Sequence, residues 1–330
     1  MKLIIQIPCY NERETLADTI GDLPRQIEGV DSVEILIIDD GSTDGTADHA
    51  RKLGAHHIVR FNRNRGLAKG FMAGLDACLR LGADIIVNTD ADNQYCGADI
   101  PKLIQPILDG ESDMVIGDRQ VETVEHFSAT KKKLQRFGSW VVRQASGTQV
   151  PDATSGFRAI SREAALRLFV TSEFTYTLET LIQAGNAHLA VSAVPIRTNA
   201  KTRDSRLFRS ITQYLRRSAS TIIRIYTMYR PLKAFLYLAS LLFLLGTGLG
   251  GRFLYFHLTE DHTGHIQSLI LAAILLIVSF VVLLSGLLAD LVSANRKLLE
   301  DAIMRLRRLE YGQEPTLPAP DPSSPSDEPK

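Results

Sequence analysis

Short apolar runs rich in β-branched residues alternate with longer segments of helical periodicity along the first two thirds of the chain. The apolar runs predict strands at residues 3–7, 35–38, 85–88, 114–116 and 191–196, with helices between them. This alternation is typical of an α/β domain, a mostly parallel sheet with helices on both faces. We therefore expect one such domain over residues 1–204, beginning with a strand rather than a signal peptide.

Two long apolar runs near the C-terminus have the length of membrane-spanning helices. Residues 234–251 form eighteen and residues 266–289 twenty-four successive positions without a charge. Each run can cross the ~30 Å hydrocarbon core of a bilayer. A buried helix of a soluble domain is the alternative for one run alone, but two runs in succession favour a hairpin. We expect transmembrane helices at residues 234–256 and 266–290.

Basic residues lie on the same side of this hairpin, before its first span and after its second. Residues 205–233 have the pattern of basic amphipathic juxtamembrane helices, although a surface helix of the globular domain fits the same pattern. The positive-inside rule places the α/β domain and both termini in the cytosol, on a multi-pass anchor in the cytoplasmic (inner) membrane. Beyond the second span we expect a cytoplasmic helix at 291–312 and a disordered tail at 313–330. The basic residues are Arg216, Arg217, Arg224, Arg230 and Lys233, then Arg296, Lys297, Arg305, Arg307 and Arg308.

Composition argues against several classes of function. The formal net charge is zero, so no overall basic field favours a nucleic-acid partner. The three cysteines, Cys9, Cys78 and Cys96, lack C-x-x-C spacing, which argues against a disulfide framework or a zinc site and favours reduced cytosolic thiols. No G-x-G-x-x-G follows the first strand, so a dinucleotide-binding reductase is disfavoured.

Two acidic residues, Asp90 and Asp92, follow directly after the apolar run at residues 85–88. In an extended chain their side chains point the same way, and Gln94 continues that face if the chain stays extended. Two converging carboxylates repel, and a divalent cation removes the conflict. Oxygen ligands of this kind suit Mg²⁺ or Mn²⁺. Two solvated loop acids are the alternative, because the motif is short.

Polar residues also follow the first and second predicted strands. Asp39 and Asp40 precede the turn GSTDG, in which Ser42 or Asp44 can cap the next helix. Capping does not explain the two further acids, whose carboxylates suit ribose hydroxyls or the N–H of a base. The first strand ends in residues that suit stacking and hydrogen bonding of a base, Pro8, Tyr10, Asn11 and Glu12. The segment NRNRGLAKG adds positive groups suited to a diphosphate, Arg63, Arg65 and Lys69.

Six motifs, taken in order, carry a resemblance to a known family. They are IPCYNE, IIDDGSTDGT, NRGLAKGFMAGL, NTDADNQ, GDR and TSGFRAI. Together they resemble the family 2 glycosyltransferases of the dolichyl-phosphate mannose/glucose synthase type, which have the GT-A fold, over roughly residues 3 to 207. The resemblance implies metal-dependent, inverting transfer of a sugar from a nucleotide-diphosphate sugar, of the GDP-mannose or UDP-glucose type, to a polyprenyl phosphate in the membrane.

The same resemblance implies roles for individual residues. For the metal these are Asp90, Asp92 and Gln94, and for catalysis Asp90, Asp92 and Arg119. For the donor they are Pro8, Tyr10, Asn11, Glu12, Asp39, Asp40, Lys69, Asp90 and Ala91. For the acceptor phosphate they are Arg119, Ser155, Arg203, Ser205 and Arg206. Arg206 departs from the family's R-x-x-S-K-L element, which has Lys there, so the charge is kept but its geometry changes.

Rival interpretations stay open. A processive polysaccharide synthase of the same fold carries Q-x-x-R-W, whereas residues 213–217 read QYLRR and the single Trp is Trp140. A catalytically inactive, membrane-anchored nucleotide-sugar-binding protein is the other alternative, although the D-x-D acids are present. A phosphate acceptor is already ionised at neutral pH, so no general base is required. Asp118, Asp152 and Glu179 are the candidates for one. Glycines of the first span, at 246, 248, 250 and 251, make a homo-oligomer conceivable.

Overall fold

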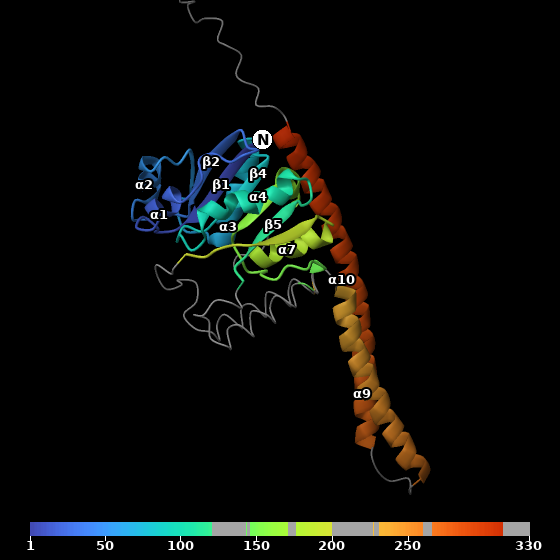
Figure 1. Cartoon of the computed structure of the whole chain (residues 1–330). Helices are drawn as coiled ribbons and strands as arrows, with labels where there is room; N and C mark the ends of the chain where they lie inside the picture. Colours follow the sequence, from blue (N-terminus) through green and yellow to red (C-terminus); the bar gives the residue numbers. More distant parts are fainter. Residues whose placement is uncertain are drawn as a thin grey trace, which may run out of the picture.

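The computed structural model describes residues 1–120, 146–170, 176–199, 231–259 and 266–312, together with the isolated positions 143 and 227 (Figure 1). An α/β domain carries the first three of these segments, and a long helical hairpin carries the last two. The expected tail at 313–330 and nearly all of the basic segment at 205–233 lie outside the described residues.

One sheet of seven strands forms the centre of the described part of the domain, in the order β3-β2-β1-β4-β6-β5-β7. Only β6 runs antiparallel to its neighbours. The strands are β1 (Lys2–Cys9), β2 (Ser32–Asp39), β3 (His57–Arg60), β4 (Ile85–Asn88), β5 (Met114–Asp118), β6 (Arg158–Ser161) and β7 (Val191–Pro195). All five predicted strands are present, and the mostly parallel sheet is confirmed.

Two strands were not predicted from the sequence, β3 and β6. Each is only four residues long, which is too short to show a clear period. β3 is the sequence HIVR at the edge of the sheet. β6 begins with Arg158, a charged residue that is fully buried and that a hydrophobicity pattern therefore misplaces.

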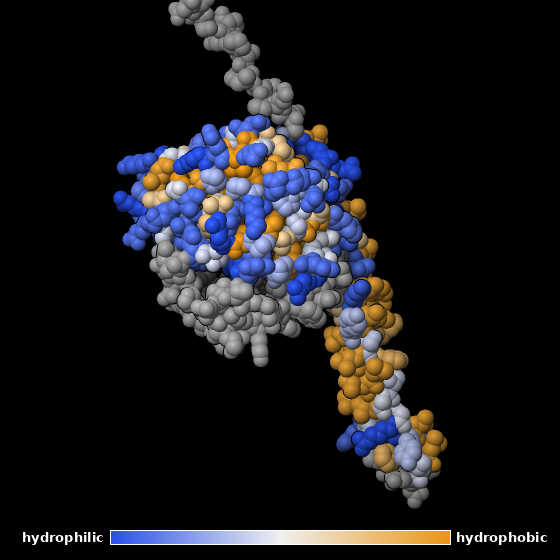
Figure 2. Space-filling model, in the orientation of Figure 1, coloured by the Kyte–Doolittle hydropathy of each residue, from blue (hydrophilic) through white to orange (hydrophobic). Residues whose placement is uncertain are grey.

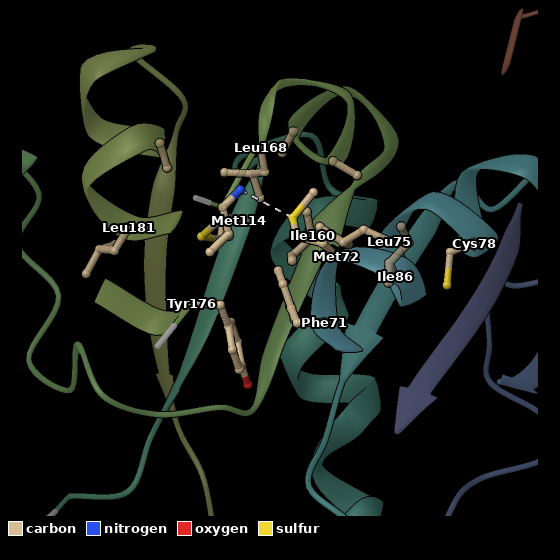
Figure 3. Close-up of a cluster of buried hydrophobic side chains, with 14 of the residues drawn as sticks. Phe71, Met72, Leu75, Cys78, Ile86, Met114, Ile160, Leu168, Tyr176 and Leu181 are labelled. Carbon is tan, nitrogen blue, oxygen red and sulfur yellow. Dashed lines mark hydrogen bonds between the residues drawn. The ribbon is translucent and has the colours of Figure 1, made fainter. Parts of the chain in front are cut away.

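Alternating side chains of the strands build two cores, one on each face of the sheet. Leu3, Ile5 and Ile7 of β1 face the core formed with α1, α2 and α4, whereas Ile4 faces the core formed with α3, α6 and α7. Figure 3 shows part of the second core, in which Phe71 and Met72 of α3 lie between strands and Tyr176. The helices are α1 (Leu16–Gly21), α2 (Thr46–Lys52), α3 (Leu67–Arg80), α4 (Ile100–Leu108), α6 (Arg162–Arg167) and α7 (Thr177–Asn186), with a 3₁₀ turn at Gly97–Asp99.

The C-terminal hairpin consists of α9 (Pro231–Thr259) and α10 (Ile266–Gly312). By length and composition both helices can cross a membrane, and only 11% and 17% of their most apolar windows are buried, which distinguishes them from core helices of a soluble domain. Figure 2 shows the apolar surface that they present. The expected boundary between the second span and the cytoplasmic helix falls inside α10, which continues through it without a break.

Small residues allow α9 and α10 to approach each other closely. A Cβ at Gly286 would lie 2.6 Å from the Cβ of Phe235, and one at Gly246 would lie 3.1 Å from Leu276. The hydroxyl of Ser279 donates a hydrogen bond to the carbonyl of Ala239 across the pair, at 2.9 Å. Gly246 therefore packs within the hairpin of a single chain, as a small residue does between membrane helices.

The last turns of α10 dock on the α/β domain. The Arg307 guanidinium donates to the carbonyl of Leu168 at 2.7 Å and to Asp76 at 2.9 Å, and it is buried. Farther along, Arg80 pairs with Glu310 at 2.9 Å. Met304 and Tyr311 pack against the core on the α3 face. The end of α10 thus joins the hairpin to the domain through contacts that are more than 130 residues apart in the chain.

These contacts fix the direction of α10 relative to the sheet. Arg307 lies level with Asp76, and Glu310 lies level with Arg80, so α10 runs in the same direction as α3. Because α3 starts after β3 at the carboxyl edge of the parallel strands, the earlier, apolar part of α10 projects beyond that edge. Figure 1 agrees: the N-terminus, at the start of β1, lies beside the end of α10, far from the hairpin loop.

Candidate active site

The polar segments named in the sequence gather at the carboxyl edge of the sheet. β1 pairs with β2 on one side and with β4 on the other, so the direction of winding reverses between β1 and β4. Open α/β sheets bind their ligands in the crevice at such a point. The loop after β1 carries Tyr10, Asn11 and Glu12, and the loop after β4 carries Asp90 and Asp92.

The loops after β1 and β2 are fastened to each other. The backbone N–H of Asn11 donates to the Ser42 hydroxyl at 2.9 Å, and the backbone N–H of Thr43 donates to the side-chain oxygen of Asn11 at the same distance. The Glu12 N–H donates to Thr46, the first residue of α2. Asn11 has a φ of 54°, a conformation that Asn tolerates better than most residues. The Tyr10 ring is 44% exposed beside these loops, which suits the expected stacking on a base.

The two acids after β2 have different surroundings. Both oxygens of Asp40 accept backbone N–H groups, from Arg65 at 2.7 Å and Gly66 at 2.9 Å, so this side chain holds the basic loop. Burial raises the pKa of Asp40, and these hydrogen bonds oppose the rise. Asp39 is fully buried, and one of its oxygens accepts the Ser42 N–H. Its other oxygen accepts no hydrogen bond from the described residues, although the Arg60 Nε lies 3.2 Å away. Asp39 therefore retains an acceptor that suits a ligand.

The basic loop between β3 and α3 forms an open pocket of about 430 Å³, lined by Arg63, Asn64, Arg65 and Lys69. Gly41 allows the loop to pass over the end of β2, because a Cβ there would lie 2.5 Å from the backbone of Arg63. Arg65 also lies over the ring of Phe61, at 4.9 Å from its centroid. The predicted positive groups thus surround one pocket beside Asp40.

The expected extended face of the acidic motif is only partly correct. β4 ends at Asn88, and the chain turns after Asp90, with Asn93 at a φ of 53°. Gln94 nevertheless returns to Asp92, since its amide N–H₂ donates to one carboxylate oxygen of Asp92 at 2.8 Å. The carbonyl of Ala91 accepts the hydroxyls of Thr15 and Thr19, at 2.8 and 3.0 Å. In this arrangement Gln94 braces Asp92, and Ala91 ties the motif to α1.

The carboxylates of Asp90 and Asp92 fit a divalent cation. Burial, and then the negative charge of Asp92, raise the pKa of Asp90 to about 7. The positive charge of Arg119 opposes the rise without cancelling it, and a cation between the two carboxylates would relieve their repulsion. Among the described residues no cluster of three or more His, Cys, Asp or Glu side chains could hold a metal. Two carboxylates alone leave most of the coordination shell to water and substrate phosphates, which is the usual pattern for Mg²⁺.

Arg119, at the end of β5, forms a bidentate pair with Asp152. Its Nε and Nη2 donate to the two oxygens of Asp152 at 2.7 and 3.0 Å, and Nη2 also donates to the Thr154 hydroxyl at 2.9 Å. Although burial alone would raise it, this pairing holds the pKa of Asp152 below its ordinary value. Asp152 is 2% exposed, so it acts as the fixed counter-charge of Arg119. The sequence did not predict this pairing, because 33 residues separate Arg119 from Asp152.

A buried polar network behind Asp90 was also missed. The Asn88 amide receives a hydrogen bond from Gln6 and donates to the carbonyl of Gly156 and the hydroxyl of Tyr176, at 2.8–2.9 Å. A Cβ at Gly156 would lie 3.1 Å from both carboxylate oxygens of Asp90. Two amide residues inside otherwise apolar strands, Gln6 and Asn88, were the feature of the sequence that could have indicated this network.

The buried side chain of Arg158 holds the TSG segment, residues 154–156, in place through hydrogen bonds to the backbone. It donates to the carbonyls of Ala153, Ser155 and Thr177 and to the hydroxyl of Thr180, each at 2.8 Å. Burial lowers the pKa of Arg158 to about 10, so it stays charged at neutral pH. The hydroxyl of Ser155 is buried and has no hydrogen-bond partner among the described residues. Ser155 follows Thr154, whose hydroxyl accepts a hydrogen bond from Arg119. The family resemblance implies an acceptor phosphate at this position.

The structure therefore brings most of the predicted site residues to one edge of the sheet. The residues on its loops, its strand ends and the first turn of α3 are Pro8, Tyr10, Asn11, Glu12, Asp39, Asp40, Lys69, Asp90, Ala91, Asp92, Gln94, Arg119 and Ser155. The predicted acceptor residues Arg203, Ser205 and Arg206 lie outside the described residues.

Comparison with known proteins identifies the family. The family model described as glycosyl transferase family 2 matches residues 4–169. The chain is 29% identical over 206 residues to a polyprenol monophosphomannose synthase of Mycolicibacterium smegmatis, covering 59% of this chain and 76% of that protein. It is 31% identical over 217 residues to a UDP-N-acetylglucosamine–dolichyl-phosphate N-acetylglucosaminyltransferase of Methanococcus voltae, covering 58% of this chain and 83% of that protein.

A solved structure shows the same fold. Glucosyl-3-phosphoglycerate synthase from Mycobacterium tuberculosis, in complex with Mn²⁺, UDP-glucose and phosphoglyceric acid, superposes with a TM-score of 0.54 at 22% identity, covering 68% of this chain and 79% of that one. This similarity confirms a GT-A-like α/β fold. With the family model spanning half of the sequence and the site motifs in place, the chain belongs to glycosyltransferase family 2.

Proposed function

We propose that this protein transfers a sugar from a nucleotide-diphosphate sugar to a polyprenyl phosphate, at the cytoplasmic face of the membrane that holds its hairpin. The names of two relatives support this proposal, since one is a polyprenol monophosphomannose synthase and the other acts with dolichyl phosphate. Both GDP-mannose and UDP-sugars are compatible donors. A processive polysaccharide synthase and a binding protein without activity are the rival functions.

The observation that carries the proposal is the orientation of the site relative to the hairpin. The apolar part of α10 projects beyond the carboxyl edge of the sheet, which is the edge that carries the acidic and basic loops. Leu67, where α3 begins at that edge, lies level with about residue 298 of α10, judged from the pairing of Asp76 with Arg307. At 1.5 Å per residue the site edge is roughly 12 Å from the expected end of the span. A lipid phosphate at the membrane surface is within reach of such a site.

The chemistry proposed is one in-line displacement at the anomeric carbon, with inversion. A bound Mg²⁺ or Mn²⁺, held by Asp90 and Asp92, would offset the charge that develops on the departing nucleoside diphosphate. Asp39 and the loop after β1 would hold the nucleoside, and the pocket of Arg63, Arg65 and Lys69 offers positive charge for the diphosphate. Arg119, already paired with Asp152, would be oriented toward sugar or phosphate without adding net charge.

The surroundings of the candidate bases support a mechanism without a general base. Asp152 is committed to Arg119, and its carboxylate is held in the ionised form. Glu179 is fully buried in α7. Asp118 accepts the backbone N–H of Gln120 at 2.9 Å in the turn after β5. A phosphate monoester has a second pKa of about 6, so the acceptor is already nucleophilic at neutral pH.

The test is transfer of radiolabelled sugar from a panel of GDP- and UDP-sugars into organic-extractable polyprenyl phosphate, with Mg²⁺ or Mn²⁺. The wild-type chain is compared with Asp92→Ala and with Asp48→Ala, an exposed acid of α2 that pairs only on the surface with Arg51. We expect label in lipid from one donor, unchanged in Asp48→Ala and reduced at least about 100-fold in Asp92→Ala.

Three results would contradict the proposed transfer reaction, and a fourth would contradict the mechanism without a base. Label in a growing water-soluble polymer would identify a processive synthase. Nucleotide-sugar binding by calorimetry with no transfer from any donor would favour an inactive binding protein. Undiminished transfer by Asp92→Ala would remove the acidic motif from the mechanism. Loss of turnover on changing Asp118 or Glu179, with donor binding intact, would show that a base is needed.

A further inference from the structure

From the last turn of the expected span onward, α10 has large apolar residues, mostly leucines, on the side that faces away from the domain. Seven large apolar side chains between residues 288 and 309 are each 62–70% exposed. They are Leu288, Leu291, Val292, Leu298, Leu299, Leu306 and Leu309. Scattered exposed leucines need no explanation, but large apolar residues gathered along one side of a polar helix do.

The opposite side of the same helix makes the contacts with the rest of the chain. Ser293 and Arg307 are buried, and Met304 and Tyr311 are half-buried against the core of the domain. None of the residues that the structure describes covers the leucine side. The helix therefore has two distinct faces. One packs on its own domain, and the other is apolar and has no partner among the described residues.

The spacing of the outer face is that of a coiled-coil seam. Residues 288, 292, 295, 299, 302, 306 and 309 alternate steps of four and three, which is the a/d pattern of three heptads. The seam has Val292, Leu299 and Leu306 at a, with Leu288 and Leu309 at two of the d positions. Ala302 and Asn295 fill the remaining d positions, and all seven positions are exposed. Binding to a lipid surface would require an apolar face of the helix but not alternating steps of four and three residues.

We propose that this seam, Leu288 to Leu309, pairs with the same seam of a second copy of the chain in a parallel two-stranded coiled coil. The parallel orientation rests on the proposed insertion of the hairpin, because a membrane gives α10 of every copy the same direction. In two copies in register, Asn295 meets Asn295, so its amide finds a partner that an apolar helix from another protein would not supply. An identical face on each copy closes as a symmetric dimer.

The flanks of the seam agree with this partner. In a parallel pair, position g of one helix lies beside position e of the next heptad on the other. Leu291 then meets Arg296, Leu298 meets Ile303 and Arg305 meets Glu310, so of the three flanking pairs one is apolar and one has opposite charges. Arg305 and Glu310 are exposed, and each forms an ion pair within its own chain, with Asp301 and Arg80. None of the three pairs places like charges together.

Site-directed cross-linking in membranes tests the pairing. Two differently tagged copies of the full chain are co-expressed with Cys96 replaced by Ser, since the other two cysteines are buried. Single cysteines are introduced as Leu299→Cys, Leu306→Cys or Lys297→Cys, the last on the exposed position farthest from the seam. After oxidation we expect both seam variants, but not Lys297→Cys, to give a product of twice 36.5 kDa that contains both tags.

The two seam variants together also test the orientation, because only a parallel pair brings both Leu299 and Leu306 against their own counterparts. A second measurement uses the double variant Leu299→Asn/Leu306→Asn, whose folding should be intact because both side chains are exposed. In mild detergent its mass, measured by light scattering, should fall from two chains to one. Equal cross-linking at all three positions, no cross-linking, a product with a different protein, cross-linking at 299 alone, or an unchanged dimer of the double variant would each overturn the proposal. None of these readouts requires glycosyl transfer, so failure of the proposed activity would not imitate them.

Discussion

At the scale of single residues, the site depends on buried charges that are neutralised in pairs. Asp152 is nearly enclosed and Arg119 is 22% exposed, and the two share two hydrogen bonds. Each charge therefore offsets the cost of burying the other. Asp90 has no such fixed partner in the described chain, and burial with Asp92 beside it raises its pKa to about 7. The contrast separates a structural ion pair from the two carboxylates that we propose hold a cation.

The Arg119 pair leads to a prediction about stability and pH. Asp152→Asn leaves a buried guanidinium without its counter-charge and should lower the free energy of unfolding by about 3 kcal/mol near neutral pH. Because the folded-state pKa of Asp152 lies below its ordinary value of 3.8, the wild-type advantage is complete above that pH and is lost as the pH falls through the folded-state value. Thermal unfolding of the full chain in detergent, at about pH 7 and about pH 3, measures it.

The matched control is Asp48→Asn, which breaks an exposed pair with Arg51 and should change stability by less than about 0.5 kcal/mol. If the difference in free energy of unfolding between wild type and Asp152→Asn stayed constant from neutral to strongly acid pH, the ion pair would not be its source.

At the scale of elements, the docked end of α10 determines how the domain is held. Arg307 reaches across to a backbone carbonyl of the segment after α6 and to a carboxylate of α3, and it stacks on Phe169 at 5.6 Å. A single helix thus continues from the apolar hairpin to the edge of the sheet opposite the edge that carries the site. The domain is positioned by packing and not only by its covalent connection.

The docked end leads to a prediction for Arg307→Ala. The change leaves the Leu168 carbonyl and Asp76 without their donor and should cost about 1–3 kcal/mol. Amide hydrogen exchange over residues 304–312 should accelerate, since the helix end is released from the domain. Arg305→Ala is the control, because its guanidinium is 76% exposed and pairs within the helix. Equal exchange rates in the two variants would mean that Arg307 does not hold the helix end.

At the scale of the whole molecule, the proposed insertion of the hairpin implies that the length of α10 between span and docking contacts sets the distance of the site from the membrane. Duplicating residues 291–297 adds two helical turns, lifts the domain by roughly 10 Å and changes the helical phase by only about 20°. The docking residues and the a/d spacing are kept. We expect nucleotide-sugar binding to be unchanged and transfer to a long-chain polyprenyl phosphate in membranes to fall at least about tenfold.

The same enzyme should lose less activity toward a short-chain, water-soluble polyprenyl phosphate, since that acceptor need not stay in the bilayer. Seven residues inserted after Gly312 provide the control, because they lie beyond the docked helix end. Full activity of the duplicated variant on the membrane acceptor would show that α10 does not set the height of the site.

Local patterns in the sequence were sufficient for much of this molecule. The five predicted strands, the acids at the end of β4, the motifs of glycosyltransferase family 2 and the two apolar helices all depend on neighbours within a few residues. Burial of every second residue in a strand, and the length of a charge-free run, are properties that a single segment has by itself.

Tertiary structure decided what depends on residues far apart in the chain. The buried Arg158 in β6, the pairing of Arg119 with Asp152, and the docking of Arg307 on Asp76 have no local signature. The turn after Asp90, which changes how Gln94 meets Asp92, depends on contacts of that loop with α1 and with Asn199. In each case the free energy of a buried polar group depends on which partner packing brings to it, and no short stretch of sequence specifies that partner.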